Sequence, residues 1–119
     1  DQLIVSEGVY SMDGDSADIV KLNQLAQQHN AKTYIDDAHS IGVIGDKGQG
    51  SSYYHESDLT MATFGKAVAT SGAFVACDDD MFQFLVNYSR HYIYSTAISP
   101  AIAWATIKSI DLIKSFSRD

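Results

Sequence analysis

Short apolar runs alternate with stretches of helical spacing along the chain. Four runs have the length and the β-branched or aromatic content of strands, at residues 3–5, 32–36, 59–64 and 72–77. Between the first two runs, residues 16–29 place apolar side chains on one face at helical spacing, with Lys21 and several glutamines facing outward. A strand, a helix and a strand over this length predict a βαβ unit. We therefore expect buried, parallel strands joined by a right-handed crossover.

Local signals indicate where the first helix begins and ends. Asp15 or Ser16 is expected to cap the helix at residues 16–29, and Asp18 falls in its first turn. Asn30 suits a left-handed residue that stops the helix. Later in the chain, the link between the strands at 59–64 and 72–77 is short for a crossover. The last strand is therefore expected at a sheet edge or antiparallel to its neighbour.

The second half of the chain predicts two more helices. The first covers residues 79–88 and has a buried stripe of Met81, Phe82, Leu85 and Val86. Residues 92–94 are expected to form a brief extended run. Pro100, with Ser99 as its cap, opens the final helix.

The order of elements predicts an α/β fold, with a mostly parallel sheet and helices packed on it. Residues 37–58 form a long, nearly structureless loop with dispersed glycines, and they lack the GxGxxG spacing of a dinucleotide site. Loops of this length in a small domain are usually functional or interfacial. The sheet is thin for its helices and would leave apolar faces uncovered, so we expect a fragment of a larger domain.

Composition narrows the class of protein. The 119 residues carry a net charge of −7 and no cluster of lysines and arginines, which argues against nucleic-acid binding. The single cysteine, Cys77, cannot form an internal disulfide, so a reducing, cytoplasmic setting is expected. No stretch reaches the roughly 20 apolar residues of a membrane span. No signal peptide is visible, and the missing initiating Met again suggests a piece of a longer protein.

Polar side chains follow three of the predicted strands, and parallel strands bring such positions to one edge of a sheet. These positions are Ser11, the cluster Asp36 to His39, and Thr63 to Lys66. Each has an ordinary structural role when taken alone: a turn hydroxyl, a helix cap, a structural histidine, a surface lysine. Their predicted convergence in one pocket favours a chemical role.

Several chemistries could use such a set of side chains. A calcium loop at Asp13 to Asp15 lacks its later ligands, and a metal site has one histidine with no nearby glutamate. A serine hydrolase would need a GxSxG elbow, which is absent. Pyridoxal phosphate needs a lysine, an acid for its pyridine nitrogen, and hydroxyls for its phosphate and ring oxygen. This set of residues fits that cofactor best, and no metal is expected.

Three motifs in this order resemble the α-oxoamine synthase family of fold-type I pyridoxal phosphate enzymes. They are residues 7–15 (EGVYSMDGD), residues 36–45 (DDAHSIGVIG) and residues 63–67 (TFGKA), with Tyr94-Ser95-Thr96 belonging to the same pattern. The resemblance implies that residues 1–119 are the central part of the cofactor-binding large domain. The family's glycine-rich N-terminal part and its small C-terminal domain are absent, so we expect little or no turnover from this chain alone.

The resemblance also implies roles at the site. Lys66 would form the Schiff base with pyridoxal phosphate and act in proton transfer. Asp36 would pair with the pyridine nitrogen, with His39 near the ring's phenolic oxygen and Ser11 on the same side. Thr63 would bind the phosphate.

The same resemblance implies a role for Ser95 or Thr96. One of them would reach the phosphate of the cofactor in a partner subunit, which implies a homodimer with a shared active site.

Asp37 is a less suitable ring acid than Asp36. Alternation along the strand places its side chain on the opposite face from that of Asp36. Residues 68–70 (VAT) replace glycines that the pattern would lead us to expect after the lysine.

The activity implied is that of an acyltransferase, which joins an amino acid to an acyl thioester with loss of carbon dioxide. Residues 64–65 and 71–73 resemble the family members that join L-alanine to a pimeloyl thioester more than 2-amino-3-ketobutyrate CoA ligase, 5-aminolevulinate synthase or serine palmitoyltransferase, which remain the alternatives within the family. The alternative from another class is a non-catalytic α/β interaction module, which would take up no cofactor and tolerate loss of Asp36.

Overall fold

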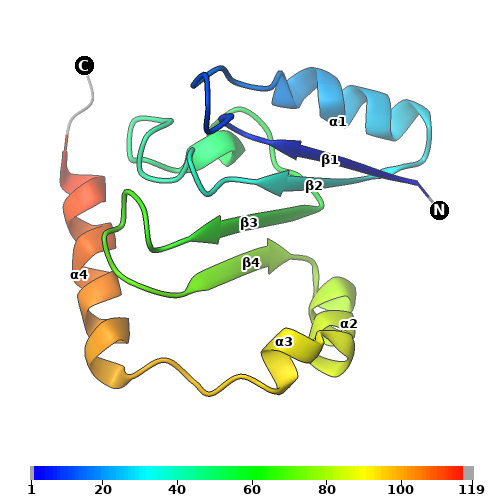
Figure 1. Cartoon of the computed structure of the whole chain (residues 1–119). Helices are drawn as coiled ribbons and strands as arrows, with labels where there is room; N and C mark the ends of the chain where they lie inside the picture. The colour runs from blue at the N-terminus through cyan, green and yellow to red at the C-terminus, as the bar shows by residue number, and fades with distance from the viewer. Residues whose placement is uncertain (1, 117–119) are drawn as a thin grey trace.

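Four strands form one sheet in the order β1-β2-β3-β4, within residues 2–116, the part of the chain that this computed structural model describes (Figure 1). The strands β1 (Leu3–Glu7), β2 (Lys32–Asp36) and β3 (Leu59–Thr63) run parallel. Strand β4 (Ala73–Cys77) pairs with β3 in the antiparallel direction. The predicted mostly parallel sheet and the antiparallel last strand are both confirmed.

Helix α1 (Ile19–Gln28) packs on β1 and β2, but it begins later than predicted. Its N-cap is Asp18, whose side chain accepts a hydrogen bond from a backbone N–H of the first turn. The predicted caps, Asp15 and Ser16, were wrong because both residues belong to the hairpin-like turn after β1, which an antiparallel bridge to Ser16 closes. Asn30 takes φ +49°, as expected of a left-handed stop.

The remaining helices are α2 (Asp79–Tyr88), α3 (Arg90–Ile93) and α4 (Pro100–Ser115). The expected extended run at 92–94 is wrong, because backbone hydrogen bonds of helical spacing close α3 around it. The long loop after β2 also has more structure than predicted, since it contains a short 3-10 helix, η1 (Gly50–Tyr53). Within residues 2–116, no helix is long and apolar enough to cross a membrane.

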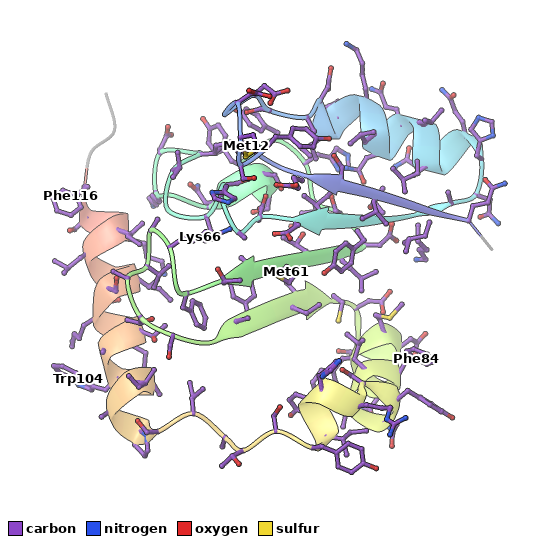
Figure 2. The ribbon with its side chains drawn as sticks, in the orientation of Figure 1. Met12, Met61, Lys66, Phe84, Trp104 and Phe116 are labelled. Atoms are coloured by element: carbon purple, nitrogen blue, oxygen red, sulfur yellow. The ribbon has the colours of Figure 1, made fainter. Side chains whose placement is uncertain are left out.

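Burial is less complete than the apolar pattern predicts. Val5 on β1 is 64% exposed, and Phe82 in the predicted buried stripe of α2 is 52% exposed. Both predictions of burial are wrong for the described residues, because no second layer covers those faces. Trp104 on α4 is similarly exposed, as Figure 2 shows. The uncovered apolar faces expected from the sequence are therefore present.

A polar network fixes β2 against the start of β3. Asp58, just before β3, accepts hydrogen bonds from the Thr33 N–H at 2.8 Å and from the Lys32 ammonium at 2.7 Å. The Thr33 side chain is completely buried, and its hydroxyl lies 3.1 Å from the Asn23 carboxamide oxygen of α1. One cluster of side chains thus ties α1, β2 and β3 together.

Helix α4 runs along the edge at which β1, β2 and β3 end (Figure 1). It packs on the loop between β3 and β4 through Val68, which is 1% exposed. The Ser109 hydroxyl donates to the Val68 carbonyl, and the hydroxyls of Thr70 and Thr106 lie 2.8 Å apart. The loop that contains Lys66 is therefore held from outside by a helix.

Replacing Asp58 should destabilise the protein, by an amount that depends on pH. Asp58→Ala leaves the buried Thr33 N–H without its acceptor, which costs about 1–3 kcal/mol. Burial raises the pKa of Asp58, but the Lys32 ammonium and the Thr33 donors outweigh burial and hold this pKa below its usual value. Because the folded pKa is the lower one, the charge-dependent part of the stability is present above about pH 4 and is lost as the pH falls through the folded pKa.

Urea unfolding of the full-length protein at pH 7 and pH 3 measures this dependence. The stability lost in Asp58→Ala should be smaller at pH 3, and the exposed Asp13→Ala serves as the control. An equal loss at both pH values would show that the Asp58 charge does not contribute.

Backbone strain in the loop after β3 gives a second prediction. Ala69 takes φ +57°, a conformation that suits glycine, and it lies among the residues where the sequence pattern leads one to expect glycines. Ala69→Gly relieves the strain of the left-handed conformation but gives the unfolded chain more conformational freedom. The strain is the larger effect, so the free energy of unfolding should rise by about 1 kcal/mol.

The matched control is Ala67→Gly in the same loop, because Ala67 is not among the residues with positive φ. That variant should lose about 0.4–1 kcal/mol instead. Chemical unfolding of the full-length protein distinguishes the two, and the same sign of change in both variants would contradict the strain at Ala69.

Candidate functional site

Parallel pairing places three loops at one edge of the sheet. The register aligns Glu7 of β1 with Asp36 of β2, and Asp36 with Met61 of β3. The arrowheads of these three strands point the same way in Figure 1, and β4 points back. The loops that leave β1, β2 and β3 therefore start side by side at one edge, as expected of parallel strands.

The first loop contains Ser11. Its turn is closed by the Tyr10 N–H, which donates to the Asp15 carbonyl at 2.9 Å, and by a second bond from the Gly14 N–H to the Tyr10 carbonyl. Gly14 takes φ +73°, so the tight turn depends on glycine there. Ser11 is exposed in this turn, and its hydroxyl forms no hydrogen bond within residues 2–116.

The second loop contains Asp36 and His39. Asp36 ends β2 and is half-buried, and its Oδ1 accepts a hydrogen bond from the Ala38 N–H at 2.9 Å. The other carboxylate oxygen has no partner among the described residues. Burial, and then the negative charge of Asp36, raise the pKa of the Tyr34 hydroxyl two residues earlier. Asp36 thus offers a carboxylate oxygen to a ligand at the strand end, and the half-buried His39 lies three residues further on.

Asp37 has surroundings quite unlike those of Asp36. It is 1% exposed, and its Oδ2 accepts a hydrogen bond from the Ser51 N–H of η1 at 2.8 Å. This carboxylate faces the interior, in agreement with the alternation argued from the sequence. It is not available to a ligand at the loop surface.

The third loop contains Thr63 and Lys66. Thr63 ends β3 opposite Ala73 and is half-buried. Lys66 lies beyond the end of β3, on the loop that α4 holds (Figure 2). Its ammonium is exposed and forms no ion pair or hydrogen bond with residues 2–116. No side chain within residues 2–116 therefore competes with a ligand for the Lys66 Nζ.

The structure places five of the residues chosen from the sequence at strand ends of this edge or on the loops that leave it. They are Ser11, Asp36, His39, Thr63 and Lys66. Ser95 and Thr96 lie elsewhere, on the exposed segment between α3 and α4 that passes on the far side of β4 (Figure 1). Those two residues therefore lie apart from the loops that leave β1, β2 and β3.

The combination at the edge is an amine, a carboxylate, an imidazole and two hydroxyls. A carboxylate suits a protonated ring nitrogen, hydroxyls suit anionic oxygens, and a free amine suits an aldehyde carbon. In the described part of the chain, no group of three or more His, Cys, Asp or Glu side chains is arranged to hold a metal ion. These side chains have the chemistry that an anionic, aromatic aldehyde would need in a binding site.

Sequence reasoning missed the contribution of Gly8 and Ser40 to this edge. A Cβ at Gly8 would lie 2.2 Å from Asp37 Oδ1 and 2.3 Å from the Ser40 hydroxyl, so glycine is needed there for packing. The available signal was a glycine directly after a strand, where close backbone approach is common. That signal does not indicate which side chain fills the space.

Known proteins share both the sequence and the fold of this chain. The model of the aminotransferase class I and II family matches residues 1–118. The chain is 44% identical over 116 residues to the 8-amino-7-oxononanoate synthases of Salmonella paratyphi B and Salmonella newport. These matches cover 96% of this chain, which spans 30% of the length of those curated relatives.

Two solved structures show the same architecture. Serine palmitoyltransferase from S. paucimobilis, with a bound PLP-myriocin aldimine, matches with a TM-score of 0.84 and 32% identity, over 95% of this chain and 29% of that one. The 8-amino-7-oxononanoate synthase from Francisella tularensis matches with a TM-score of 0.79 and 29% identity, over 97% of this chain and 35% of that one. The predicted fold and the resemblance to α-oxoamine synthases are confirmed, and the chain belongs to the aminotransferase class I and II family.

Proposed function

We propose that the full-length protein is a pyridoxal phosphate-dependent acyltransferase of the α-oxoamine synthase kind. It condenses a pimeloyl thioester with L-alanine and releases the thiol and carbon dioxide, which leaves 8-amino-7-oxononanoate. The observation that carries the proposal is the parallel pairing of β1, β2 and β3, which places the lysine, acid, histidine and hydroxyls at strand ends or on loops of one edge. The 44% identity to 8-amino-7-oxononanoate synthases supports the choice of reaction.

The residues at this edge fit the proposed cofactor. Asp36 keeps one carboxylate oxygen free of partners among residues 2–116, as a protonated pyridine nitrogen would require. Lys66 forms no ion pair in the same range, so no carboxylate of these residues competes with an aldehyde for its Nζ. Ser11 lies on the loop after β1 and Thr63 at the end of β3, where their hydroxyls could serve the phosphate and ring oxygens.

When bound, pyridoxal phosphate supplies an electron sink that stabilises negative charge on the α-carbon of an amino acid. In this proposal Lys66 holds the cofactor through Nζ and moves the proton of the α-carbon. The free oxygen of Asp36 keeps the ring nitrogen protonated, because a carboxylate beside it favours the charged form. His39 donates to the phenolic oxygen beside Ser11, and Thr63 binds the phosphate.

Serine palmitoyltransferase activity is the second candidate, since the fold matches that enzyme with a TM-score of 0.84 and 32% identity. Both candidates place the same chain residues at the cofactor, so residues 2–116 support them equally. The higher identity to the oxononanoate synthases, 44%, favours the first. The acyl chain and the amino acid distinguish the two reactions.

We further propose a cytoplasmic homodimer with a shared active site. Ser95 and Thr96 lie on an exposed segment away from the edge that holds Lys66, so a role at a cofactor is open to them only across subunits. The exposed apolar faces of α2 and α4 leave surface available for such contacts.

An activity assay of the full-length protein tests the proposal. With L-alanine and pyridoxal phosphate, a pimeloyl thioester should give 8-amino-7-oxononanoate, while acetyl, succinyl and palmitoyl thioesters should react at least about 100-fold more slowly, the discrimination that contacts along a whole acyl chain can supply. Lys66→Ala should abolish turnover and the absorbance band of the lysine-bound cofactor. The exposed Lys47→Ala, on the glycine-rich loop, should change neither.

A palmitoyl thioester with L-serine as the best pair would replace this proposal with the second candidate. An unchanged cofactor band in Lys66→Ala would refute both, and absence of any cofactor uptake would favour the non-catalytic module.

A further inference from the structure

Asp37 is a buried acid to which the proposed function gives no role. Only 1% of its surface is exposed, although carboxylates are rarely buried without full pairing. Its Oδ2 accepts one hydrogen bond, from the Ser51 N–H at 2.8 Å. Its Oδ1 is buried and has no partner within residues 2–116. An unpaired buried oxygen costs free energy of folding, so the surroundings of Asp37 need an explanation.

Two glycines make room for this carboxylate. A Cβ at Gly8 would lie 2.2 Å from Asp37 Oδ1, and a Cβ at Gly50 would lie 2.5 Å from Asp37 Oδ2. Real side chains cannot come so close, so the backbone after β1 and the backbone at the start of η1 both pack directly on the carboxylate. Ser51, next to Gly50, supplies the N–H that fixes Oδ2. Asp37 thus joins two segments that lie far apart in the sequence.

The main chain of Asp37 builds the turn that holds His39. The Asp37 N–H donates to the Met61 carbonyl of β3 at 2.7 Å, and its carbonyl accepts from the Ile41 N–H at 2.9 Å. Asp36 precedes Asp37 directly, and His39 lies inside the turn that these bonds close. A displacement of Asp37 therefore moves both of these side chains.

We propose that Asp37 is a positioning residue for the cofactor site. The carboxylate between Gly8 and Gly50 holds the loops after β1 and β2 together, and in this way sets where Asp36 and His39 meet the cofactor. This inference rests on the proposed function. The residue acts through its Oδ2, which accepts the hydrogen bond from the Ser51 N–H. It does not need the negative charge, because the only donor to the side chain within residues 2–116 is a backbone N–H.

Two substitutions in the full-length protein, loaded with pyridoxal phosphate, test this role. Asp37→Ala removes the acceptor and should lower kcat/KM by roughly 100-fold, as small misplacements of reacting groups do. It should also weaken cofactor binding, measured by titrating the apoprotein. Asp37→Asn keeps the shape and an oxygen for the Ser51 N–H, and should retain kcat/KM within about threefold. The control is Asp46→Ala, an exposed acid in the same loop, which should behave as the parent.

The two variants separate positioning by the acceptor from a role of the negative charge. Loss in Asp37→Ala with rescue in Asp37→Asn supports the inference, and a folded Asp37→Ala with parental activity and cofactor affinity overturns it. A folded Asp37→Asn that loses roughly 100-fold in kcat/KM also overturns it, even where Asp37→Ala fails to fold. Cofactor uptake that survives Lys66→Ala with an unchanged absorbance band would instead mark failure of the proposed function itself.

Discussion

The parallel pairing of β1, β2 and β3 is the constraint on which the rest of this structure depends. In their register Glu7 pairs with Asp36, and Asp36 pairs with Met61, so the loops after the three strands leave the sheet at one edge. An antiparallel neighbour at β2 would send one of these loops to the opposite edge. The polar network at Asp58 and Thr33 fixes this pairing from the other end of the strands. The proposed chemistry follows from that alignment.

The contacts of Asp37 and of helix α4 support the loops at this edge. Asp37, buried between two glycine backbones, holds the loops after β1 and β2 in place. Helix α4 holds the loop after β3 through Val68 and the hydroxyl pair of Thr70 and Thr106. The exposed residues that would meet a ligand are thus supported by buried ones. Precise placement of a reacting lysine on a loop requires support of this kind.

The sequence predicted the elements and the edge better than the details of packing. The spacing of apolar residues is a local property of the sequence, and it predicted the four strands β1 to β4. The positions of Asp36 and Lys66 at or beyond strand ends followed from where those strands end. The N-cap at Asp18 was missed because Ser16 forms an antiparallel bridge with Val9 and so cannot begin the helix. The local sequence does not reveal that bridge. Burial of Phe82 was overestimated, because periodicity shows which face is apolar and not what covers it. The role of Asp37 depends on tertiary contacts that no local pattern contains.

The central claim is that Lys66 holds the cofactor. Treating the full-length protein, loaded with pyridoxal phosphate, with borohydride reduces a lysine–cofactor bond and makes it permanent. Proteolysis and mass spectrometry then locate the modified residue. The account predicts one phosphopyridoxyl group per chain, on the peptide that contains Lys66. A stoichiometric label on any other lysine, or a cofactor that leaves no label on Lys66, would contradict it.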